Sequence, residues 1–188
     1  MIFYSVIIVL AVILVTALNG FFGVGWKLTL IWGSVALGVM VAIDIIVAVF
    51  VRMIPEKKLD PFGKIFTVSQ RERKFYEKLG VRKWKDLIPE TGKYLCDFAK
   101  DKIAEPNNNE YVLKFLRETC YAGLMHAISI VLSFAALFLP YRLPIVLPVV
   151  LTNVFLQALP VMTQRYNRFR LVKLYRYNER IARRNGNG

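Results

Sequence analysis

Four stretches of the chain are almost wholly apolar: residues 2–18, 28–51, 119–139 and 143–163. Each approaches or exceeds the ~20 residues of helix that cross a bilayer. The first stretch is short, but the glycine-rich residues after it can extend it. Short turns join the first stretch to the second and the third to the fourth. We therefore predict an all-α integral membrane protein with four transmembrane helices in two hairpins, forming a single membrane domain over residues 1–188.

Polar residues divide the rest of the chain. The pattern gives a first hairpin (1–52), a cytoplasmic interfacial region (53–109), a second hairpin (110–163) and a basic cytoplasmic tail (164–188). In the interfacial region, Ser69-x-x-Glu72 is a capping box that opens a short helix, and Gly80 can end it. The aromatic and aliphatic side chains of this helix fall largely on one side, which is typical of an amphipathic helix in the membrane interface.

Small and polar residues recur at helical spacing in the second hairpin. We expect a long third helix over about 110–139, with an N-cap among residues 107–109. Pro160 is expected to interrupt the fourth helix near its cytoplasmic end. Stripes of this kind face partner helices rather than lipid. The two stripes are Thr119, Ala122, His126, Ser129 and Ser133, and then Asn153, Gln157, Gln164 and Arg168.

The charge distribution sets the expected orientation. The chain is 56% hydrophobic and has a formal net charge of +13. Of its 26 lysines and arginines, all but Lys27 and Arg142 lie outside the two short turns. The positive-inside rule therefore places the interfacial region and the C-terminus in the cytoplasm. This topology and attraction to anionic lipid explain the basic charge, so nucleic acid is not an expected partner.

His126 is the only histidine of the chain, and it lies within an apolar stretch. Ionisable side chains at membrane depth are costly to bury and mark functional sites by default. An imidazole, with an ordinary pKa near 6.5, suits proton transfer, so His126 is the leading general-base candidate. The alternative is a histidine that only hydrogen-bonds a neighbouring helix.

Two acids accompany His126 in the apolar segments. Glu118, eight residues earlier, is a candidate to orient His126 or to hold the acceptor; its alternative is an ordinary solvated carboxylate. Asp44 is more simply explained by pairing with an amide or arginine of the fourth helix. Cys96 and Cys120 are expected to stay reduced, and with one histidine they form no recognisable metal site. No metal or other cofactor is expected.

The densest polar cluster follows the fourth apolar stretch. Its three arginines could clamp phosphates bidentately, or they could simply stop membrane insertion. A second basic group surrounds Trp84, which suits the level of lipid headgroups. The candidate substrate-binding residues are Gln164, Arg165, Tyr166, Asn167, Arg168, Arg170, Trp84 and Lys85.

Three motifs together resemble a known family. They are Val81-Arg-Lys-Trp-Lys85, Glu118-Thr119 followed by His126, and Gln164-Arg-Tyr-Asn-Arg-x-Arg-Leu171. With their spacing over about residues 55–171, they are similar to the glycosyl-4,4'-diaponeurosporenoate acyltransferases. The resemblance implies a bacterial cell-membrane enzyme of carotenoid biosynthesis that moves a fatty acyl group to a sugar hydroxyl of a glycosyl carotenoid or related glycolipid. With His126 as base, acyl-CoA is the expected co-substrate.

The chain departs from the family pattern at three positions. Gly123 stands where the family has Glu, Gln157 where Asn is usual, and Phe169 where Pro is usual. The change at Gly123 leaves an alternative function open. In that alternative, the protein is a non-catalytic four-helix membrane lipid-binding or assembly protein that has lost the family's acid.

Overall fold

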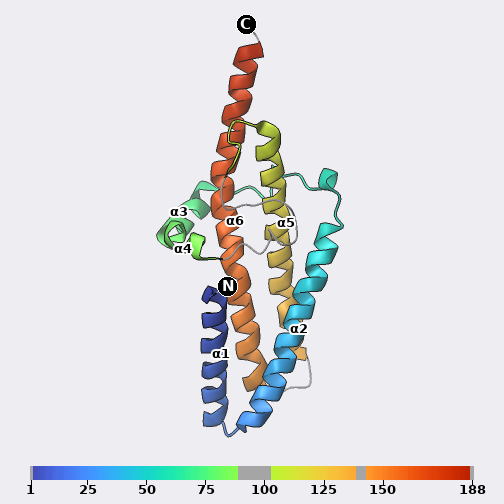
Figure 1. Cartoon of the computed structure of the whole chain (residues 1–188), viewed down its shortest axis with the longest axis vertical. Coiled ribbons are helices and arrows are strands. Elements are labelled where there is room, and N and C mark those ends of the chain that lie inside the picture. Colours follow the sequence, from blue (N-terminus) through green and yellow to red (C-terminus); the bar gives the residue numbers. More distant parts are fainter. Residues whose placement is uncertain (1, 89–102, 139–142, 187–188) are drawn as a thin grey trace. The chain divides into compact units, whose positions relative to one another are not determined.

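The computed structural model describes residues 2–88, 103–138 and 143–186, and every regular element within these ranges is helical (Figure 1). This confirms the all-α fold. Among the described residues, the short 3-10 turns Glu56–Lys58, Lys85–Leu87 and Phe134–Phe138 follow α2, α4 and α5 respectively. The α-helices are α1 (Ile2–Phe21), α2 (Trp26–Arg52), α3 (Gln70–Lys78), α4 (Val81–Trp84), α5 (Asn109–Ser133) and α6 (Leu143–Gly186).

Three helices are long and apolar enough to cross a membrane: α2, α6, and α5 together with the 3-10 turn that follows it. The apolar stretch of α1 over Val6–Phe21 is shorter. Large apolar side chains such as Val9, Phe50 and Val131 point away from the protein, as lipid-facing residues do. The helices therefore suggest a multi-pass membrane protein, and three of the four predicted spans meet the length criterion.

The chain forms two compact units. Unit 1 comprises residues 1–52 and 125–159, and unit 2 comprises residues 53–124 and 160–188. Helices α5 and α6 each contribute residues to both units. The single domain predicted over 1–188 stays a prediction.

In unit 1, α1 and α2 form an antiparallel hairpin (Figure 1). Gly23 has a φ of +71°, a conformation that favours glycine and lets the chain turn within a few residues. The side-chain amide of Asn19 is fully buried and donates to the carbonyls of Val15 (2.8 Å) and Pro144 (3.0 Å). This amide therefore links the end of α1 to the start of α6. The core of the unit packs Met40, Ala136, Val146 and Val150.

In unit 2, the predicted helix signals are confirmed. The Ser69 hydroxyl accepts a hydrogen bond from the Glu72 amide (3.1 Å), and α3 starts at the next residue after Ser69. Gly80, with φ +64°, follows the end of α3. The Asn108 carboxamide oxygen caps α5 by accepting from the amide of Glu110 (3.0 Å). The core packs Val112, Phe115, Leu116 and Leu171.

One fold prediction is wrong. Pro160 does not interrupt the fourth helix, because α6 continues through it to Gly186 and the basic tail is helical up to that residue. Proline lacks an N–H and so removes one hydrogen bond from a helix interior. The other hydrogen bonds of a helix of 44 residues can hold the backbone across that position.

Candidate functional site

A partly buried polar network of unit 1 consists of three side chains from three helices. Nδ1 of His126 (α5) lies 2.5 Å from the Oε1 atom of Gln157 (α6). The Gln157 Nε2 atom donates to Oδ2 of Asp44 (α2), at 2.6 Å. The pairing of Asp44 with a helix-four amide was predicted, and it is confirmed. The amide thus connects the histidine to a carboxylate in the apolar part of the protein.

The chemistry of these groups gives the network a direction. The NH2 group of Gln157 faces the carboxylate of Asp44, which accepts the hydrogen bond. The Gln157 carbonyl oxygen then faces His126 and requires a donor at Nδ1. A neutral imidazole that carries its proton on Nδ1 has its lone pair on Nε2. The arrangement therefore favours Nε2 as the basic atom of His126.

The predicted polar stripes of the second hairpin do face each other in unit 1. Besides the contact of Gln157 with His126, the Asn153 amide donates to the Ser133 hydroxyl at 2.8 Å. Ser133 and Ser129 are both buried, at 0% and 1% exposure. Helical spacing placed these residues on one side of each helix, and the paired contacts follow from it.

A mostly apolar cavity of about 230 Å³ adjoins Asn153 in unit 1. Residues of α1, α2 and α6 line it, including Ile8, Gly33, Leu37 and Leu156. The few polar side chains in its wall are hydroxyls and the Asn153 amide. A cavity with this lining suits a hydrocarbon chain with a polar end.

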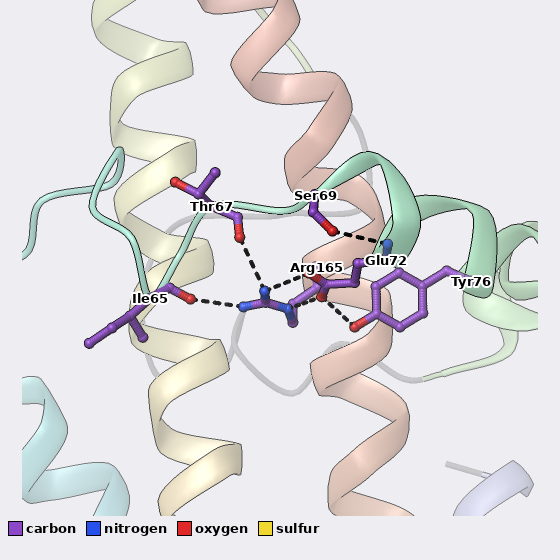
Figure 2. Close-up of polar contacts among 6 residues, drawn as sticks. All are labelled: Ile65, Thr67, Ser69, Glu72, Tyr76 and Arg165. Carbon is purple, nitrogen blue, oxygen red and sulfur yellow. Dashed lines mark hydrogen bonds and ion pairs between the residues drawn. The ribbon is translucent and has the colours of Figure 1, made fainter.

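Arg165 joins α6 to α3 in unit 2 (Figure 2). Its guanidinium contacts both carboxylate oxygens of Glu72 and donates to the carbonyls of Ile65 (3.0 Å) and Thr67 (3.3 Å). Hydrogen bonds from Arg165 lower the pKa of Glu72 below its ordinary value. Burial, together with the Glu72 carboxylate, raises the pKa of Tyr76 to about 12. These shifts describe an ionised carboxylate fixed between an arginine and a phenol.

Arg168 is buried, with 3% exposure, and it holds oxygen atoms of two other segments of unit 2. It donates to the carbonyl of Leu116 (3.1 Å), to the hydroxyl of Thr119 (2.7 Å) and to the carbonyl of Pro61. Its guanidinium also lies over the ring of Phe66, 5.3 Å from the centroid. These contacts, like those of Arg165, support a positioning role.

The other predicted site residues differ in their surroundings. Glu118 is 6% exposed, so the alternative of a solvated carboxylate is wrong. The Trp84 indole donates to the carbonyl of Leu79 (3.1 Å) at the end of α3, and Lys85 pairs with Asp86 at 2.7 Å.

Arg170 is exposed and lines a basic cavity with Tyr166, while Gln164 and Asn167 are partly buried. The other cations of this cavity are Arg73, Arg82 and Lys173, and the sequence did not predict that Arg170 lies with them. One face of α6 carries four of the lining residues, at spacings of three, one and three: Tyr166, Phe169, Arg170 and Lys173. This helical spacing could have indicated the cavity, but counting the basic residues alone does not reveal it.

Metal-binding groups of three or more His, Cys, Asp or Glu side chains are not found among the described residues. Cys120 is buried and carries a free thiol, whereas Cys96 lies outside the described residues.

A comparison with protein families identifies the family of the chain. The model of the glycosyl-4,4'-diaponeurosporenoate acyltransferases matches residues 62–177, more than half of the chain. The chain belongs to this family. The match covers α3 to most of α6 and so includes His126, Gln157 and the arginines of unit 2. Neither the curated proteins nor the solved structures yield a match.

Membership in the glycosyl-4,4'-diaponeurosporenoate acyltransferase family makes the protein an acyltransferase of a carotenoid pathway that acts on a glycosyl carotenoid. The apolar helices agree with an acceptor that resides in the membrane. The family match confirms the resemblance that the sequence motifs indicated.

Proposed function

We propose that the protein transfers a fatty acyl group from acyl-CoA to a sugar hydroxyl of a membrane-embedded glycosyl carotenoid or related glycolipid, with His126 as general base. The observation that carries the proposal is the network of His126, Gln157 and Asp44. An aspartate that orients a histidine through a hydrogen bond is a recurrent arrangement for general bases. Here the Gln157 amide stands between the two groups.

The proposed acyl transfer needs only the two substrates and the imidazole of His126. Nε2 of His126 takes the proton of the sugar hydroxyl as the hydroxyl oxygen attacks the thioester carbonyl carbon. The C–S bond breaks, and the departing thiolate takes the proton from the imidazolium. An ester and free coenzyme A result. The Asp44 carboxylate stabilises the transient positive charge of the His126 imidazolium through Gln157. Because these groups are already in place, the stabilisation requires little reorganisation of the site.

The apolar lining of the cavity beside Asn153 supports the proposal that this cavity of unit 1 binds the hydrocarbon part of the acceptor. Glu118 remains a predicted second acid of the site. Its burial in unit 2 agrees with a carboxylate held by protein groups rather than by water. For the donor, we retain the predicted group of Gln164, Arg165, Tyr166, Asn167, Arg168 and Arg170 with Trp84 and Lys85, and assign Arg165 and Arg168 to positioning within it.

The non-catalytic alternative rests on Gly123, which replaces the family's acid. A Cβ atom added at Gly123 meets nothing within 4 Å, so the first atom of a side chain has room there. Asp44 already provides a carboxylate that is linked to His126 through Gln157. We therefore expect the wild-type protein, reconstituted with acyl-CoA and a glycosyl carotenoid, to form a product heavier by one fatty acyl group. Gly123→Glu should change this rate by less than tenfold. If only Gly123→Glu forms product, the wild-type protein is the non-catalytic form, and mass spectrometry of extracted lipids decides between them.

We also propose that the polar region before α5 and the C-terminus lie in the cytoplasm of a bacterial cell, because 24 of 26 basic residues lie outside the short turns. In a variant without Cys96 and Cys120, a cysteine at position 27 should react with a membrane-impermeant maleimide in whole cells. A cysteine at position 180 should react only after permeabilisation. The reverse pattern would exclude this orientation.

A further inference from the structure

A basic cavity of unit 2 has a volume of about 340 Å³ and lies among α3, α4 and α6. Four cationic side chains and one carboxylate line it, with two aromatic rings. Its lining residues are Arg73 and Glu77 of α3, Arg82 of α4, and Tyr166, Phe169, Arg170 and Lys173 of α6. The formal charge of the lining is therefore +3.

The Phe169 ring organises two of these cations. The Arg73 guanidinium lies 4.6 Å from the ring centroid, and the Lys173 ammonium lies 4.8 Å from it. Arg73 also donates to Glu77 at 2.8 Å, so its guanidinium has a fixed orientation. Cations held on an aromatic face keep most of their hydrogen-bond donors available at the ring edge.

The contact between Arg165 and Glu72 fixes the walls of this cavity. Glu72 precedes Arg73 in α3, and Arg165 precedes Tyr166 in α6 (Figure 2). The contact therefore holds the two cavity-lining helix faces in one register. Cations gathered in a concave site repel one another, and a bound polyanion relieves that repulsion.

We propose that this cavity binds a phosphate group, with Arg82, Arg170 and Lys173 as its main ligands and Arg73 as a fixed fourth cation. Guanidinium groups suit phosphate oxygens because their N–H groups form a planar fork. Two sources carry this chemistry: the phosphates of a soluble donor such as coenzyme A, and the headgroup of an anionic phospholipid. Binding of the donor at this cavity rests on the proposed function. It would assign the donor's phosphates to this cavity rather than to Arg165 and Arg168.

Binding without turnover tests this inference separately from acyl transfer. The cavity variant is Arg82→Gln, Arg170→Gln, Lys173→Gln. The control variant is Arg176→Gln, Arg180→Gln, Arg183→Gln, which loses the same charge from exposed positions of α6 outside the cavity. Coenzyme A is titrated onto each protein in zwitterionic nanodiscs. In a second arm, each protein is titrated with vesicles that contain phosphatidylglycerol.

We expect the cavity variant to lose at least tenfold in affinity in one arm, while the control changes less than threefold in the same arm. A selective loss with coenzyme A assigns the cavity to the donor, and a selective loss with vesicles assigns it to a lipid headgroup. Equal losses in the two variants, or none, would overturn the proposal. Acyl transfer that persists in the cavity variant at saturating acyl-CoA would leave the proposed function intact whatever the binding result.

Discussion

Replacing His126 with alanine lowers acyl transfer by about 10²–10⁴-fold, the usual contribution of a positioned general base. The helices should stay assembled, because the side chain is only partly buried. His126→Gln is the sharper variant: its amide keeps a hydrogen bond to Gln157 but cannot take a proton. A structural histidine would tolerate Gln with activity largely intact, and that outcome would refute the catalytic assignment.

A matched control comes from the same facing polar stripes of the second hairpin. Ser133→Ala removes the hydrogen bond with Asn153 in unit 1 but leaves the network of His126 unchanged. This variant should keep acyl transfer within a few-fold of wild type. Asp44→Asn tests the direction of the network, because its NH2 group can donate to Gln157 and let the amide reverse. It should lower kcat and shift the pH profile, a change that lost packing alone would not produce.

Replacing Arg168 with lysine destabilises the protein by about 2–4 kcal/mol. The buried guanidinium serves three oxygen atoms, and each acceptor left without a donor costs about 1–3 kcal/mol. An ammonium group cannot reproduce the planar fork that reaches them. Thermal unfolding in detergent, followed by circular dichroism, measures the loss.

The control for this variant is Arg176→Lys, an exposed position on the same helix. Such surface changes usually alter stability by less than about 0.5 kcal/mol. If Arg168→Lys unfolds at the wild-type temperature, Arg168 does not stabilise the fold. The role in phosphate binding predicted from the sequence would then be the better explanation for this residue.

The sequence predicted those features that depend on helical period and local hydrogen bonding. The stripe containing His126 and the one containing Gln157 could be aligned because side chains three and four residues apart share a face. The cap at Ser69 depends on atoms within one turn, so its pattern is visible in the sequence.

Most contacts between distant partners could not be predicted, although the pairing of Asp44 with an amide of the fourth helix was. Arg165 meets Glu72 across a sequence separation of 93 residues, and nothing near either residue specifies the other. The three arginines after the fourth stretch looked equivalent, yet two hold the fold and only Arg170 reaches the basic cavity. The continuation of α6 through Pro160 is likewise a property of the whole helix rather than of the local sequence.

The network of unit 1 also has a consequence for the synthesis of the protein. Its members come from α2, α5 and α6, so Asp44 is made and inserted well before either partner exists. An aspartate within a membrane helix opposes insertion, by about 2.5–3.5 kcal/mol where it lies at the helix centre and by less toward an end. The strongly apolar remainder of α2 must offset this insertion cost until α6 has been synthesised and inserted. A nascent chain that ends before α6 would therefore lack the Gln157 amide that contacts Asp44, giving membrane quality control a signal that the protein is unfinished.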